Sequence, residues 1–177
     1  MSGSESPEAA INAIISELGT NLATYMAAID TIWSDAITLE TPALYLRAPY
    51  RKYSQYPVVI VEADITQIPP AFRTDHDTQN FFQNHSIQVG VILRSREQVS
   101  YQGVTLQPTE VVTIRMERTL HAIQNCLQAN PTLTISGTKN CDRLFVLAIP
   151  YPFVETVPDQ SELFEKKGFI NLRVMIS

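Results

Sequence analysis

The predicted order of helices and strands constrains this chain more than any single motif does. Hydrophobic periodicity predicts a long helix, a strand, a long polar loop, a strand, a helix and two closing strands within the 177 residues. A chain of this length fits one domain and buries roughly 70% of its unfolded surface without disulfides or metals. We therefore expect a single α+β domain over residues 1–177, with a mostly antiparallel or mixed sheet of about four to five strands.

An acidic amphipathic helix is predicted within residues 1–40. Ser6 can cap this helix, and Pro7 is tolerated at a first helical position. Apolar side chains then recur every three or four residues and form one stripe. Residues 1–46 hold six acidic side chains and no lysine or arginine, so we expect the opposite face to be exposed and negative. The stripe would pack against the domain's own sheet or against a partner subunit.

The other strands and a second helix belong to a predicted body, residues 57–177. Residues 58–61 are a continuous β-branched run, which is typical of a strand buried on both faces. Residues 86–93 alternate apolar and polar side chains, so we expect them to pair beside that strand. The apolar spacing in residues about 108–128 predicts a helix that covers one face of the sheet. Further strands are expected at 133–135, 144–149 and 169–176, with a hairpin at Gly103 and the last strand starting after Gly168.

A tyrosine-rich, basic segment between residues 41 and 57 is the main candidate interface. Its prolines exclude a regular helix, and tyrosine and arginine are enriched where proteins contact each other. The acidic helix of a neighbouring copy would be an oppositely charged counterpart. Stacking of the tyrosines on single-stranded nucleic acid is an alternative, as is a plain solvated loop. The candidate subunit-interface residues are Tyr45, Arg47, Tyr50, Arg51, Lys52, Tyr53 and Tyr56.

A long polar loop is predicted at residues 64–84. Loops of this length in compact domains tend to be functional or disordered, and in a ring such a loop would reach a neighbouring subunit or the lumen. Its carboxylate and imidazole groups, with His85 nearby, are suitable ligands for a divalent metal. Consecutive residues rarely converge on one ion, so we expect a solvated turn instead. The candidate lumen or partner residues are Arg73, Asp75, His76 and Asp77.

No residue pattern predicts catalysis or a bound cofactor. The chain has no GxSxG elbow, no P-loop and no GxGxxG, and its six glycines are scattered singly. Cys126 and Cys141 fit neither a redox pair nor a zinc site, so we expect reduced thiols. We therefore predict no enzymatic activity, no metal and no cofactor. A catalytic carboxylate pair assembled from distant positions stays an alternative.

The charge and the N-terminal sequence bear on partners and location. A formal charge of −5 disfavours nonspecific adhesion to nucleic acid, because phosphate neutralisation needs a clustered positive surface. The sequence MSGSESPEAA lacks the features of a secretory signal, and no apolar run approaches the roughly 18–20 residues that span a bilayer. We expect synthesis in the cytoplasm and no membrane partner.

Several segments together resemble the tail terminator, or tail-completion, proteins of tailed bacteriophages. They are the N-terminal helix, YPVVIVEAD, HSIQVGVILRS, VVTIRMERTLHAIQNCL and the closing GFINLRVMIS, and with the polar loop they span most of residues 7–177. The resemblance implies a structural protein of the virion, located in the tail neck. Such a protein forms a six-fold ring on the last ring of the tail tube, stops its polymerisation and joins the tail to the head connector.

The resemblance also implies the partners of the chain. It would form a homo-hexamer in contact with the tail tube protein and a head connector or neck protein. The chain departs from shorter members of that family in its long loop and in the proline-rich residues 150–158, and from the length of these segments we expect them to meet a contractile sheath or a neck protein. Genomic DNA would pass through the lumen without sequence-specific binding, since carboxylates repel phosphate. Alternatives are another neck component, such as a head-completion or sheath-joining protein, and a non-viral module that binds nucleic acid or protein.

Overall fold

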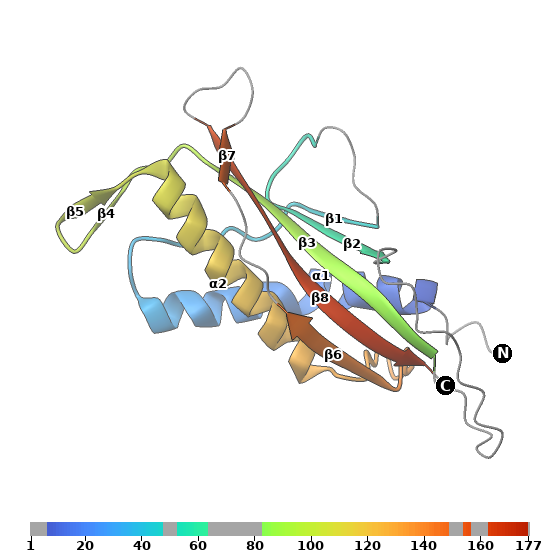
Figure 1. Ribbon diagram of the computed structural model, residues 1–177. Coiled ribbons are helices and arrows are strands. Elements are labelled where there is room, and N and C mark those ends of the chain that lie inside the picture. The colour runs from blue at the N-terminus through green and yellow to red at the C-terminus, as the bar shows by residue number, and fades with distance from the viewer. Residues whose placement is uncertain (1–6, 48–52, 64–82, 149–153, 157–162, 177) are drawn as a thin grey trace, which may run out of the picture.

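The chain folds into one mixed β-sheet, two long helices and a small separate hairpin (Figure 1). The computed structural model describes residues 7–47, 53–63, 83–148, 154–156 and 163–176. This architecture confirms the predicted α+β class. The elements are α1 (Pro7–Trp33), β1 (Leu44–Leu46), β2 (Val58–Ala63), β3 (Gln83–Ser95), β4 (Val99–Tyr101), β5 (Val104–Leu106), α2 (Pro108–Ala129), β6 (Arg143–Ala148), β7 (Val154–Thr156) and β8 (Phe164–Ile176).

The main sheet has the spatial order β1-β2-β3-β8-β6. β1 runs parallel to β2, whereas all the other strand pairs are antiparallel. β8 pairs with β3 along one edge. Along its other edge, β8 pairs with β7 near its start and with β6 near its end. The predicted pairing of the two central strands, β2 and β3, is confirmed.

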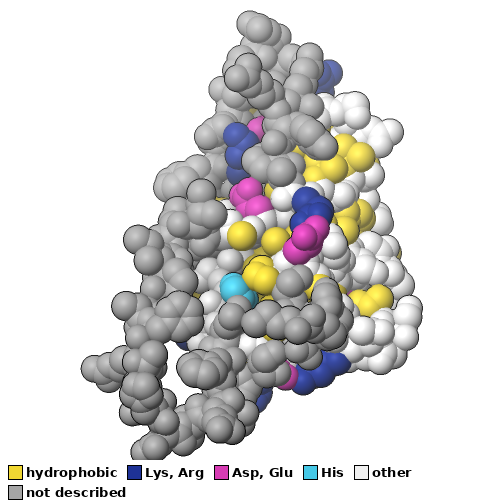
Figure 2. Space-filling view, turned by 90° about the vertical axis from the view of Figure 1, so that its right-hand side faces the viewer, with side chains coloured by type: hydrophobic (Ala, Val, Ile, Leu, Met, Phe, Trp, Pro, Cys, Tyr) yellow, Lys and Arg dark blue, Asp and Glu magenta, His cyan; other side chains and the backbone are white. Residues whose placement is uncertain are grey.

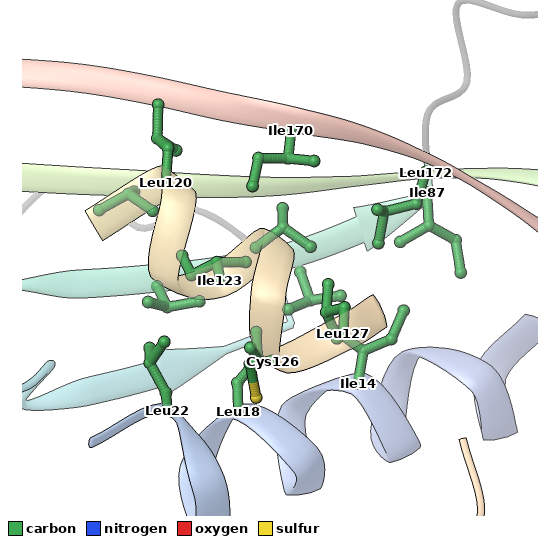
Figure 3. Packing of buried hydrophobic residues seen from close by; sticks show 14 of the residues in the cluster. Ile14, Leu18, Leu22, Ile87, Leu120, Ile123, Cys126, Leu127, Ile170 and Leu172 are labelled. Atoms are coloured by element: carbon green, nitrogen blue, oxygen red, sulfur yellow. The ribbon is translucent and has the colours of Figure 1, made fainter. Parts of the chain in front are cut away.

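Both helices pack against the same face of this sheet. Side chains from α1, α2 and four strands form one buried cluster, in which α2 lies over β3 and β8. In Figure 3 Ile14, Leu18 and Leu22 of α1 point toward α2, whose own apolar side chains continue to the strands. The apolar stripe of the N-terminal helix therefore packs in the core of its own domain. Of the two predicted alternatives, packing against the domain's own sheet and packing against a partner subunit, the structure shows the first. The labelled members of the cluster are Ile14, Leu18, Leu22, Ile87, Leu120, Ile123, Cys126, Leu127, Ile170 and Leu172.

The acidic side chains of α1 divide between its two faces, so its exposed face carries fewer of them than the sequence-based expectation. Glu17 is buried and accepts a hydrogen bond from Asn130 Nδ2 at 2.7 Å. Asp30 is half-buried and accepts a hydrogen bond from the backbone N–H of Leu39 at 3.1 Å, in the connection after the helix. Glu8 is the one acidic side chain of α1 classed as exposed. The helix ends at Trp33, within the predicted range of residues 1–40, because Ser34 has a φ of 48° and leaves the helical region.

Two arginines of α2 hold the connection between α1 and β1. Arg118 forms a buried ion pair with Asp35 and donates to the carbonyl of Ile37 at 2.9 Å. Its guanidinium lies 4.7 Å from the ring centre of Trp33. The sequence carries no local sign of this burial, because the carboxylate that neutralises Arg118 comes from a residue 83 positions away.

Arg115 anchors the same connection one turn earlier on α2. Its Nε donates to the carbonyl of Thr38 at 2.9 Å. The two terminal nitrogens reach Glu40 at 3.2 Å and Glu97 at 2.6 Å. Because the arginine side chain is buried, these three acceptors satisfy a charge that would otherwise be costly to remove from water.

β8 begins five residues before the predicted strand and runs through Gly168. A Cβ at Gly168 would lie 2.7 Å from Met116 Sδ and 3.1 Å from Leu120 Cδ1. The glycine therefore lets α2 approach the strand closely, and it does not mark a strand boundary. This close approach, which depends on a residue 52 positions away in the chain, is why the sequence-based start at residue 169 is wrong.

The remaining strands agree with the sequence in part. The hairpin at Gly103 is confirmed as β4 and β5, and Gln102 and Gly103 both have positive φ, as a two-residue type I′ turn requires. Figure 1 shows this hairpin projecting from the body beside the start of α2. The expected strand at 133–135 is reduced to a single bridge between Ile135 and Thr138. β1 and β7 have three residues each and were not predicted as strands.

Replacing Gly168 with alanine is expected to destabilise the fold. The new methyl group would push against the buried side chains of Met116 and Leu120, so we expect the free energy of unfolding to fall by about 1–3 kcal/mol. Urea denaturation measures this change. Gly90→Ala is the matched control, because the nearest atoms to its Cβ lie at an ordinary 3.9 Å. Equal effects of the two substitutions would contradict the proposed close contact.

Replacing Asp35 with asparagine should leave Arg118 charged and poorly compensated. We expect the free energy of unfolding to fall by about 3 kcal/mol at neutral pH. The hydrogen bond from Arg118 holds the pKa of the Asp35 carboxyl below its usual value. The carboxylate therefore stabilises the fold above the unfolded-state pKa of about 3.9, and this contribution disappears as the pH falls through the lower folded-state pKa.

The difference between wild type and Asp35→Asn should accordingly shrink below about pH 4. Thermal unfolding followed over a pH series measures it. Glu8→Gln serves as the control, since the carboxylate of Glu8 lies in an exposed ion pair with Arg47 and contributes little. A pH-independent difference for Asp35→Asn would argue against the buried ion pair.

Candidate functional site

The face of the sheet opposite the helices carries the candidate site. Alternate residues of β2, β3 and β8 point to this side, and none of the described helices packs against it. Its apolar centre is a separate small cluster of Val58, Ile60 and Ile92. The partly buried side chains packed against this cluster come from β1 and from the residues just before β2, namely Leu44, Leu46, Tyr53 and Tyr56.

A hollow of about 470 Å³ lies on this open face. We call it the Tyr56 hollow. Gly90 forms part of its floor, where an added Cβ would meet only atoms of Ile60, at 3.9 Å. The missing side chain at Gly90 therefore leaves space between the neighbouring strands. The hollow is lined by Tyr53, Tyr56, Ile60, Glu62, Gln88, Gly90, Val91, Ile92, Arg94, Glu165, Lys167, Gly168 and Phe169.

Charged and aromatic side chains are fixed against each other at one end of the hollow. Arg94 contacts Glu165 at 2.7 Å, and its guanidinium lies 3.9 Å from the ring centre of Tyr56. Lys167 reaches the same carboxylate of Glu165 at 3.3 Å. The rings of Tyr53 and Tyr56 meet edge to face, with their centres 5.9 Å apart. Two cations thus share one carboxylate beside a pair of tyrosines.

The electrostatics of Tyr56 reflect this setting. Burial raises the pKa of its hydroxyl, and the nearby positive charge of Arg94 opposes that shift. Tyr56 therefore stays protonated at neutral pH and can donate a hydrogen bond to a partner. Aromatic rings with a polar edge, together with arginine, are the side chains most often found at the energetic centre of protein interfaces.

Tyr45, one of the predicted interface residues, belongs to the core instead. It lies in β1 on the helix side of the sheet and packs against the main buried cluster. Burial raises the pKa of its hydroxyl to about 12, with a smaller contribution from Cys126. Successive side chains of a strand point to opposite faces of the sheet. Because Leu44 and Leu46 of β1 lie on the open face, Tyr45 between them lies on the helix side.

Arg47 has an acidic partner in its own chain. Its Nη1 lies 3.0 Å from Glu8 Oε1 in the first turn of α1, and both side chains are exposed. The counterpart expected on a neighbouring copy is thus found within the monomer. An exposed pair of this kind contributes at most about 1 kcal/mol, so the contact does not prevent Arg47 from changing partner.

Of the predicted interface residues that the structure describes, Tyr53 and Tyr56 lie at the Tyr56 hollow, whereas Tyr45 and Arg47 do not line it. The structure therefore divides the described part of the segment between the two faces of the sheet. Tyr50, Arg51 and Lys52 lie outside the described residues, as does the predicted lumen or partner group of Arg73, Asp75, His76 and Asp77. Their roles stay predictions.

Sequence analysis missed Gly90, Arg94, Lys167 and Phe169 as parts of a site. Period-two alternation along β3 puts Gly90 and Arg94 on the face opposite its buried positions, and this signal was present in the sequence. The sequence holds no such signal for the pairing of Gly90 with Phe169 or of Arg94 with Glu165, because this pairing depends on the register between β3 and β8.

A second, smaller hollow of about 290 Å³ lies on the helix side of the molecule. It is formed where the end of α1, the β4 strand and α2 meet. Arg118 and Asp35 neutralise each other at its base, whereas Glu117 and His121 lie on the exposed side of α2. The lining residues are Trp33, Asp35, Ile37, Tyr101, Ile114, Glu117, Arg118 and His121.

Within the described ranges no group of three or more His, Cys, Asp or Glu side chains could hold a metal ion. His85, near the suggested metal ligands, lies in β3, where burial lowers its pKa and favours the neutral ring. Cys126 and Cys141 are buried free thiols, as expected, and burial raises their pKa values to about 12 and about 11. Reactive thiolates are therefore scarce at neutral pH.

Comparison with known proteins assigns no family. The chain matches no protein-family model and no curated protein sequence. Among the described residues, no helix is both long enough and apolar enough to cross a lipid bilayer.

The ionisation of Tyr45 provides a test of its placement in the core. We expect one tyrosine to ionise near pH 12, later than exposed tyrosines with a pKa of about 10, and Tyr45→Phe to remove this late step. Because the folded-state pKa is raised, the protonated hydroxyl stabilises the fold below about pH 10, and this contribution is lost as the pH rises toward 12. Ultraviolet titration of tyrosinate absorbance measures the difference. If Tyr45→Phe instead removed absorbance from the step near pH 10, Tyr45 would be an exposed residue.

Proposed function

We propose that the chain is a ring-forming structural protein of a phage neck, a tail terminator that caps the tail tube. In this role a homo-hexameric ring binds the last ring of tube subunits and blocks further addition. It also presents a surface to the head connector or a neck protein, and it is part of the virion. The proposal includes no catalytic step and no cofactor.

The observation that carries the proposal is the one-sided covering of the sheet. Both helices lie on one face, and the opposite face presents a hollow lined with tyrosine, phenylalanine, arginine and lysine. Tyrosine, phenylalanine and arginine are enriched at the centres of protein interfaces, where the aromatic rings supply apolar area with few flexible bonds. The element order of the fold, α1 followed by strands, α2 and the closing strands, also agrees with the order on which the resemblance to tail terminators is based.

The charges of the described surface favour passage of DNA over its capture. Lysine, arginine, aspartate and glutamate side chains lie next to one another on the face shown in Figure 2, with hydrophobic side chains between them. Nonspecific binding to a duplex needs a clustered positive surface, and the formal charge of the chain is −5. Tyr45 packs against the main buried cluster of its own chain, which weakens the alternative of a single-strand binding segment.

Another neck component, such as a head-completion or sheath-joining protein, would have the same requirements for a binding surface. The two roles differ in what happens when the protein is missing. A terminator limits the length of the tube, whereas a head-completion protein acts on the head alone.

Tail length is therefore the decisive measurement. We expect deletion of the gene from its parent genome to give overlong tails that are not joined to heads, as seen by electron microscopy of negatively stained particles. Supplying the intact gene in trans should restore both the length and the junction.

Tails of normal length joined to heads would overturn the terminator role. Tails of normal length that fail to join heads would instead indicate another neck component.

A further inference from the structure

The smaller hollow, on the helix side of the molecule, contains an exposed tryptophan. It lies where the end of α1, strand β4 and α2 meet (Figure 1). Trp33, which is 56% exposed, and Tyr101 form its aromatic walls. Its volume of about 290 Å³ is below the roughly 300–1,000 Å³ of pockets that enclose small ligands, so its size suits a single side chain. We call it the Trp33 hollow.

One face of the Trp33 indole already holds a cation. The guanidinium of Arg118 lies over the ring, 4.7 Å from its centre, and both of its terminal nitrogens donate hydrogen bonds to the carboxylate of Asp35. Because Arg118 is paired in this way, it orients the ring without adding an uncompensated positive charge to the hollow. The exposed area of Trp33 therefore lies on the remainder of the ring. An indole face attracts cations through its quadrupole, most strongly where water is displaced.

The charged groups that line the hollow leave one carboxylate without a partner. Asp35 is neutralised by Arg118, whereas Glu117 is exposed and makes no hydrogen bond or salt bridge among the described residues. His121 also lines the hollow and counts as neutral in the formal charge at pH 7. The lining therefore carries a net negative charge beside its aromatic walls.

Two charged groups just outside the lining do not reverse this balance. Asp30 adds a negative charge near Arg118, and Lys166 adds a positive charge near Glu117. The Lys166 amine is buried and donates a hydrogen bond to Thr113 Oγ1 at 2.9 Å, so it is held between β8 and α2. Because these two charges offset each other, the Trp33 hollow keeps its negative charge, which favours a positively charged occupant.

Exposed apolar side chains border the hollow. Ile32 is 78% exposed and precedes Trp33 on α1, and Val104 is 62% exposed and pairs with Tyr101 across the hairpin. Paired residues of antiparallel strands lie on the same face, so Val104 adjoins the wall that Tyr101 forms. A free cation would leave this apolar area uncovered, whereas a peptide segment would bury it. The composition of this rim therefore suits a segment in which apolar residues flank a basic one.

We propose that the Trp33 hollow binds an arginine side chain of a partner protein, with apolar residues of the partner beside it. The guanidinium stacks on the exposed part of the Trp33 ring and pairs with Glu117, and the flanking residues cover Ile32 and Val104. Arginine suits the hollow better than lysine, because its planar and weakly hydrated group stacks on aromatic rings. This site is separate from the Tyr56 hollow, so the inference goes beyond the proposed ring function and does not depend on it.

Trp33 is the single tryptophan of the chain, so tryptophan fluorescence reports on this site alone. The probe is the peptide acetyl-Val-Arg-Val-amide, titrated into the purified full chain. A matched neutral probe has citrulline in place of arginine, which keeps the planar shape and removes the charge. We expect a saturable change with the arginine peptide and about tenfold weaker binding of the citrulline peptide. Equal affinities, or no change with either peptide up to about 10 mM, would overturn the proposal.

Glu117→Gln separates the charge contact from the apolar contacts. It keeps the shape of the side chain and should weaken binding of the arginine peptide about threefold to fivefold, with the citrulline peptide unaffected. Glu8→Gln is the matched control, because it removes the same charge in the first turn of α1, at the other end of the helix from Trp33. Equal effects of the two substitutions would mean that the net charge of the protein attracts the peptide, and the proposed site would be wrong.

The length of the probe distinguishes a protein partner from a free small cation. N-acetyl-argininamide has the same side chain without the flanking valines. It should bind about tenfold more weakly than the peptide, because Ile32 and Val104 stay uncovered. Binding as tight as that of the peptide would indicate a small cation and would rule out the protein partner. These measurements use the purified chain and synthetic probes, so their result is separate from any result on tail length.

Discussion

The packing of α2 over β3 and β8 is the constraint on which the rest of this structure depends. The helix comes so close to β8 that only glycine fits at position 168, and its buried arginines reach across to the connection after α1. Arg115 and Arg118 thereby hold α1 on the same side of the sheet as α2. Because both helices lie on one face, their apolar side chains pack into a single core. The opposite face is covered by no described helix and is formed by the strands and by the residues just before β2.

That division gives the two sides of the sheet different physical roles. The helix side is a densely packed cluster whose polar members are paired, as with Glu17 and Asn130 or Arg118 and Asp35. The open side has a smaller apolar centre bordered by Tyr53, Tyr56 and charged residues that share partners. A surface of this composition is suited to binding a protein, since apolar area can be buried there without leaving charges uncompensated.

Several strands and one helix could be predicted from the sequence, whereas the face on which a tyrosine lies could not. Residues 58–61 and 86–93 were correctly predicted as neighbouring strands, and the helix from Pro108 was predicted almost to its last residue, because local periodicity and prolines control these choices. Tyr45 and Tyr56 look equivalent in the sequence but lie on opposite faces of the sheet. The difference depends on strand β1, whose three residues are too few for periodicity to reveal.

The sequence by itself determined the class of fold, the two helices, the central strands, the turn at Gly103 and the absence of a recognisable catalytic motif. These features follow from interactions between residues near each other in the chain. Only the tertiary structure decided that Arg118 is buried, that Gly168 lies inside a strand and that Gly90, Arg94 and Phe169 share one hollow with Tyr56. Each of those outcomes depends on register and helix placement, which bring together residues far apart in the sequence and which local patterns do not encode.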